Sequence, residues 1–193
     1  MESMSLNFET LMAYLNRAIS QISDPRQSSN GKRYSSQDLI LGAFSVFFMQ
    51  CESFLEHQCY LESHEGHNNA QTLFGICRIP SDPQIRNVLD KIEVEPLFNI
   101  FTWVYQSLRE RGWLKGSEFL NGQYLIALDR TNYFSSSKIY CNQCNHRTHS
   151  NGKTSYFHSA ILPVIVSPFQ SEVISLAPEF MTPQDGHENK IVK

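Results

Sequence analysis

Apolar residues recur at helical spacing near the start of the chain, at Phe8, Leu11, Met12, Leu15 and Ile19. With Asn7 as an N-cap, this spacing predicts a first helix that Asp24-Pro25 closes. A second helix, about 25 residues long, is expected after Ser35 or Ser36. Because its stretch 39–48 is apolar almost all round, we expect it to form the buried centre of a helical bundle.

A pair of short helical signals follows the polar stretch 64–69, which has the composition of a loop. The first covers 70–74, and the second covers 81–92, with Ser81 and Gln84 in capping-box register. The second helix would leave Arg86, Asn87 and Lys91 exposed, which is the outline of a DNA-reading helix-turn-helix. Packing within a helical bundle explains the same pattern. A longer amphipathic helix is expected from Pro96 to Gly112.

The pattern changes to strand at Tyr124. The segment YLIALDRT is apolar until Asp129, which predicts a strand buried on both faces that presents one acid at its end. The alternative is that Asp129 ends a strand and begins a turn. Two further strand-like runs, SYFHSAILPVIVSP and SEVISLAPEF, follow a polar insert. The predicted class is therefore α+β.

Composition narrows the functional classes. The 193 residues are 41% hydrophobic and 18% charged, as in an ordinary globular protein. No secretory signal or membrane-spanning run is visible, and the five cysteines are expected to be reduced in a cytoplasmic protein. The formal net charge of -3 means that any DNA affinity must come from a local basic patch.

Three blocks carry a family resemblance: LIALDRTNYFSSSKIYCNQC, RTHSNGKTSYFHSAILPVIV and VISLAPEFMTPQDGHE. They resemble, in order, the first part of the catalytic domain of bacterial insertion-sequence transposases of the DDE class. The upstream segment NNAQTLFGICRIPSDPQIRNVLD is similar to the N-terminal region of those enzymes. The resemblance implies a helical, DNA-binding region over 1–118 and a partial RNase H-like domain over 119–193, with an insert at about 135–154.

In that family two Asp and one Glu hold two Mg²⁺ ions for DNA cleavage and strand transfer. The resemblance assigns the first Asp to Asp129 and the following Thr to Thr131. Arg130 stands where family members usually have Gly, and a long cation there would crowd the DNA backbone or compete for Asp129. Asp185 is interpreted as a turn acid rather than as the second catalytic Asp.

The family's second Asp and its Glu lie beyond the segments that this chain matches, so we expect an incomplete Mg²⁺ site and a truncated, inactive fragment. The last residues read HENKIVK, where family members continue His-Glu-Lys-Gln-Asp-Cys-Glu. Deleting one adenine from codons for that continuation yields the observed ending. This predicts a frameshift, either a decayed copy or a programmed slip.

The insert carries a separate metal-site hypothesis. Cys141, Cys144, His146 and His149 are potential zinc ligands within a short stretch. Their spacing is tighter than in usual zinc fingers, and the alternative is a reduced surface loop. His158, in the strand SYFHSAIL, is interpreted as a packed, hydrogen-bonded histidine.

Three functions follow from these observations. The first is DNA transposition, with this chain as an inactive fragment. The second is an inhibitor that binds element ends, associates with full-length transposase or forms homo-oligomers. The third is a small zinc-binding structural protein unrelated to transposition.

Overall fold

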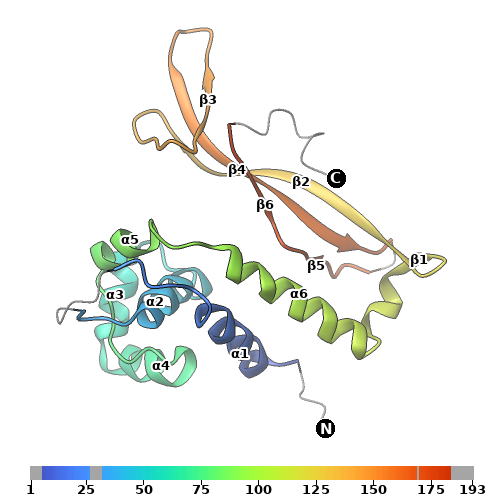
Figure 1. Ribbon diagram of the computed structural model, residues 1–193, viewed down its shortest axis with the longest axis horizontal. Helices are drawn as coiled ribbons and strands as arrows, with labels where there is room; N and C mark the ends of the chain where they lie inside the picture. The colour runs from blue at the N-terminus through green and yellow to red at the C-terminus, as the bar shows by residue number, and fades with distance from the viewer. Residues whose placement is uncertain (1–5, 27–31, 169, 184–193) are drawn as a thin grey trace. The chain divides into compact units, whose positions relative to one another are not determined.

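The computed structural model describes residues 6–26, 32–168 and 170–183. In these residues six helices precede an antiparallel sheet of six strands (Figure 1). The predicted α+β class is confirmed. The chain divides into two compact units, residues 1–100 and 101–193, so the division falls within α6 (Glu95–Glu110). In the described ranges, no helix has both the length and the apolar character needed to cross a membrane.

The first unit packs α1 (Phe8–Ile19), α2 (Ser36–Phe48), α3 (Phe54–Glu62), α4 (His64–Phe74) and α5 (Asp82–Leu89). The predicted first helix is confirmed as α1. Asn7 is its N-cap, because the Asn7 side chain accepts a hydrogen bond from the Thr10 amide at 2.9 Å. The buried face of α1 joins α2, α3 and α4 in one apolar core. That core contains Met12, Leu15, Ile19, Ile40, Leu41, Leu61, Ala70, Phe74 and Ile76.

The single long helix expected after Ser35 is wrong, because the chain forms two helices there, α2 and α3. Between them Gln50 adopts a left-handed backbone with φ of 55°, which interrupts a right-handed helix. Ser53 then starts α3 by accepting a hydrogen bond from the Glu56 amide at 3.1 Å. The apolar pattern continues across this break, so hydrophobic periodicity alone does not reveal where α2 ends.

The loop expected at residues 64–69 is also wrong, since α4 begins at His64. Ser63 caps it by accepting from the Gly66 amide at 3.1 Å. A Cβ at Gly66 would lie 1.9 Å from the Tyr60 carbonyl oxygen, so only glycine allows α4 to approach the end of α3 this closely. Polar composition suggested a loop, whereas the cap and this close approach produce a helix.

The second unit continues from α6 through a 3₁₀ turn (Trp113–Ser117) into β1 (Glu118–Leu120) and β2 (Gln123–Ser136). The remaining strands are β3 (Asn145–Thr148), β4 (Thr154–Val166), β5 (Ile174–Ser175) and β6 (Glu179–Met181). β4 is central (Figure 1). It pairs with β2 along one edge and with β3, β6 and β5 in turn along the other, all antiparallel.

The expectation that β2 is buried on both faces is wrong. Ile126 is 55% exposed and Leu128 is 51% exposed. The strand also continues to Ser136, so Asp129 lies in its middle rather than at its end. From Leu125 onward, β4 is the strand partner of β2 among the described residues, which leaves the outer edge of β2 open.

Candidate functional site

Asp129 is exposed on β2 and lies opposite Leu162 of β4. Successive side chains of a strand point to opposite faces, so Thr131 shares the face of Asp129 and Arg130 lies on the other. Arg130 donates a hydrogen bond to the Ser159 hydroxyl at 3.4 Å. The expected competition of Arg130 for Asp129 is therefore wrong, because adjacent positions of β2 place the two side chains on opposite faces of the sheet. The expected crowding of the DNA backbone stays a prediction.

The described residues do not fit a pair of Mg²⁺ ions at Asp129. Two hard cations need several oxygen ligands, and Asp129 belongs to no group of three or more clustered potential metal ligands in the ranges described. Asp185 lies outside the described residues. Asp129 therefore does not by itself supply a two-metal centre.

A cluster of three other potential metal ligands lies in the same unit. We call Cys141, Cys144 and His158 the thiol–imidazole cluster, and their ligand atoms all lie within 4.8 Å of one another. The two sulfurs are 3.7 Å apart, and the His158 Nε2 atom is 3.3 Å from the Cys141 sulfur and 3.2 Å from the Cys144 sulfur. Cys144 is buried, His158 is half-buried and Cys141 is exposed. This donor set is suited to a soft or borderline ion such as zinc.

The local fold explains why these residues meet. Cys141 and Cys144 flank a turn in which the Cys144 amide donates to the Cys141 carbonyl at 3.2 Å. On the neighbouring strands, Asn145 of β3 lies opposite Phe157 of β4. Continuing this antiparallel register by one residue places Cys144 opposite His158, where side chains share a face.

Aromatic rings surround the His158 imidazole. Tyr133 stacks on it with ring centroids 5.7 Å apart, and Phe134 lies at the same distance in a tilted arrangement. Burial raises the pKa of the Cys144 thiol. Burial also raises the pKa of Tyr133, and charge on the two cysteines adds to that effect. The cluster is thus partly desolvated, and uncompensated thiolate charge there is costly.

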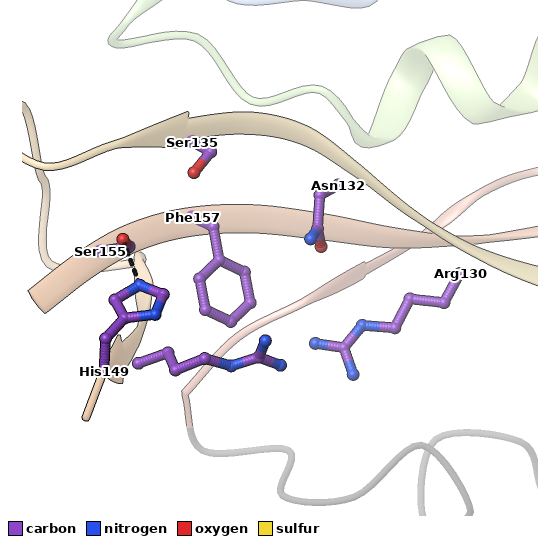
Figure 2. A pocket seen from close by; sticks show the side chains of 7 residues that line it. Arg130, Asn132, Ser135, His149, Ser155 and Phe157 are labelled. Atoms are coloured by element: carbon purple, nitrogen blue, oxygen red, sulfur yellow. Dashed lines mark hydrogen bonds between the residues drawn. The ribbon is translucent and has the colours of Figure 1, made fainter. Parts of the chain in front are cut away.

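The other two histidines of the expected zinc set lie elsewhere on the hairpin. His146 is an exposed residue of β3 opposite Tyr156. The His149 Nε2 atom is 2.7 Å from the Ser155 hydroxyl (Figure 2). The structure therefore brings the two predicted cysteines together with His158, the histidine that sequence reasoning had assigned to packing.

His149 instead lines a polar groove on the face of the sheet that carries Arg130 (Figure 2). The groove has a volume of about 360 Å³. Its lining residues are Arg130, Asn132, Ser135, Arg147, His149, Ser155 and Phe157.

The proposed DNA-contacting residues lie at α5 and just beyond it. Arg86 pairs with Asp82 one turn earlier, and its guanidinium lies 4.9 Å from the centroid of the Phe54 ring. Asn87 is exposed on the same helix, whereas Lys91 is exposed past the last helical residue, Leu89. Ser81 is the N-cap residue, but the expected side-chain cap is wrong, since its hydroxyl makes no capping hydrogen bond.

Comparisons of the chain with protein-family models, with curated proteins and with solved structures found no match.

Proposed function

We propose that the chain carries the first part of a DDE-class transposase catalytic fold, and that alone it binds DNA without cleaving it. The proposal rests on the sequence blocks that resemble that class and on the sheet in which those blocks lie. The family resemblance implies the reaction type, which is DNA transposition. The antiparallel strands are compatible with the catalytic fold of that family.

The observation that carries the proposal is an exposed Asp129 on the open-edged strand of an antiparallel β2–β4–β6 set. An RNase H-like sheet begins with three antiparallel strands, and its first strand carries the first catalytic Asp. Its next strand is parallel, and the free edge of β2 would accept it. The Asp129 carboxylate would then supply one metal ligand of that class.

The lack of cleavage follows from ligand number. The resemblance assigns one carboxylate of the three to this chain, and one carboxylate does not hold two Mg²⁺ ions. The second Asp and the Glu of that set are not assigned to any residue of this chain. Asp129 is thus proposed as a partial Mg²⁺ site rather than a complete catalytic centre.

Incubation with labelled DNA bearing the element ends tests this function. In Mg²⁺ we expect a retarded complex on a gel and an uncut strand. Absence of any complex would contradict the binding half of the proposal. Cut DNA that becomes uncut with Asp129→Asn would contradict the proposed inactivity.

The inhibitor hypothesis places DNA contacts at Arg86, Asn87 and Lys91, which are all exposed. A chain that occupies element ends, or pairs with full-length transposase, would lower transposition. Lys91→Ala should weaken the retarded complex, because a phosphate contact contributes largely through charge, whereas the exposed Lys153→Ala of the second unit is the matched control. Equal binding by both variants would count against this surface.

The zinc-protein hypothesis is favoured by the thiol–imidazole cluster. The ion we propose for that donor set is zinc. Zinc at the cluster is compatible with a transposase-like sheet as well as with an unrelated structural protein, because the cluster lies away from Asp129. Leu162, which lies opposite Asp129, is four residues from His158 on β4, about 13 Å along the strand. DNA binding therefore separates these two hypotheses, and metal content does not.

A further inference from the structure

We propose that Cys141, Cys144 and His158 form a structural zinc site that fastens the loop 137–144 to β4. This inference deepens the zinc-protein hypothesis and is independent of the proposed transposase function, since none of the three residues belongs to the DDE set. It also replaces the ligand set expected from spacing, in which His146 and His149 completed the site.

The interatomic distances carry the proposal. A tetrahedral ion with Zn–S bonds of about 2.3 Å and a Zn–N bond of about 2.0 Å holds two sulfurs about 3.8 Å apart and each sulfur about 3.5 Å from the nitrogen. The sulfurs are 3.7 Å apart, and the sulfur–nitrogen distances are 3.3 and 3.2 Å. A shift of a few tenths of an ångström in the imidazole would admit the ion.

The surroundings of the cluster have the features of a metal centre. The Cys141 amide donates a hydrogen bond to the Cys144 sulfur at 3.3 Å, and such a contact stabilises a metal-bound thiolate. Tyr133 and Phe134 flank the His158 ring, which limits its rotation and keeps Nε2 directed at the sulfurs. The site is therefore largely preorganised.

Loop 137–144 gains little from apolar burial. Ile139 is 68% exposed and Tyr140 is 66% exposed. The Ser136 hydroxyl accepts from the Ile139 amide at 2.9 Å, and the Tyr140 ring stacks on Tyr156 at 4.8 Å. A zinc ion would add three bonds that join this loop directly to the central strand.

Among the described residues the cluster supplies three ligands, and Cys141 is exposed. A water molecule would fill the fourth position of a tetrahedral ion, as it does at other zinc sites with two cysteines and one histidine. The role inferred for the ion is mechanical, because a bound metal contributes its binding free energy to the fold.

Metal analysis of the full chain, purified without an affinity tag in reductant and supplied with zinc, tests the site. We expect one zinc per chain in the wild type and in His146→Ala and His149→Ala. His158→Ala and Cys144→Ser should lose the metal. Cobalt substituted for zinc should give the intense visible bands of tetrahedral Co²⁺ and the ultraviolet absorption of thiolate ligation.

His158→Cys guards against simple misfolding, because a third thiolate restores a ligand. It should retain the metal and show stronger thiolate–cobalt absorption than the wild type. A wild-type chain without stoichiometric zinc, or with a Cys141–Cys144 disulfide that persists in reductant, would overturn the proposal. Zinc retained by His158→Ala but lost by His146→Ala would overturn the ligand set.

Discussion

Asp38 shows how one side chain joins segments far apart in the sequence. It lies in the first turn of α2, where its charge favours the helix. It is also buried, and its carboxylate accepts a hydrogen bond from the Cys77 amide at 2.7 Å. Sequence pattern predicts the first of these roles but not the second, because the second depends on the tertiary fold.

Replacing Asp38 with Ala should therefore destabilise the first unit. The Cys77 amide would lose its acceptor, which costs about 2 kcal/mol of unfolding free energy. Urea denaturation followed by circular dichroism measures this change, with the exposed Asp90→Ala as the control. Equal midpoints for the two variants would show that the Asp38 contact is dispensable.

His57 makes the stability of the first unit depend on pH. It is 2% exposed, and its Nε2 atom is 2.8 Å from the Ser45 hydroxyl. Burial lowers the pKa of His57 below its ordinary value, so the folded chain keeps it neutral while the unfolded chain takes up a proton. Its contribution is full above the unfolded pKa of about 6.5 and declines as the pH falls below it.

We therefore expect the melting temperature to fall between about pH 7.5 and about pH 5.5, a range in which most carboxylates stay ionised. His57→Asn should flatten that dependence, even though it lowers stability overall. The exposed His67→Asn should leave the slope unchanged. An identical slope in the wild type and His57→Asn would refute the assignment.

At the scale of elements, local signals predicted the helices with clear ends. Asn7 begins α1, and Gly112, with φ of 71°, follows α6 as a left-handed terminator. The α2–α3 break and the first part of α4, residues 64–69, were missed, although Ser53 and Ser63 are capping residues. At the α2–α3 break, the continuous apolar pattern favoured one long helix over the cap at Ser53. At the start of α4, the polar composition of residues 64–69 favoured a loop over the cap at Ser63.

The thiol–imidazole cluster could have been predicted from the sequence by identifying the hairpin turn at Asn151-Gly152 and the strand register that it sets. Asn151-Gly152 favours a hairpin turn, and Gly152 has φ of 77°. A hairpin closed there pairs Thr148 with Thr154, and the same register leads to Cys144 opposite His158. Sequence reasoning treated this region as an insert, so β3 and its register were overlooked.

Removal of zinc should release the loop 137–144. Lys138 lies in that loop and is exposed, so trypsin should cleave after it faster once a chelator has been added. Adding zinc back should restore protection. The control is Lys153, which lies at the hairpin turn away from the cluster and should be cleaved at the same rate in both conditions.

At the scale of the whole molecule, the two units differ in how they bury apolar surface. The first buries its apolar side chains in two helical clusters, whereas β2 in the second leaves Ile126 and Leu128 more than half exposed. An open, apolar edge strand promotes association between chains. The antiparallel sheet is thus expected to be the aggregation-prone part of the protein.

Leu128→Lys should reduce that association, because a charged side chain on an edge strand disfavours pairing with another chain. Light scattering at increasing protein concentration measures the effect. The control is Leu55→Lys, which places the same charge on an exposed position of α3. Equal improvement in both variants would indicate a general effect of charge rather than an effect of the β2 edge.

Competition between two DNA duplexes of equal length tests the transposase assignment most directly. One carries the terminal sequence of the element around the reading frame, and the other carries the same bases in scrambled order. At one fixed salt concentration, the chain should bind the terminal duplex more tightly, because base contacts add to the phosphate contacts that both share. Equal affinity for the two duplexes, or no binding to either, would contradict the assignment.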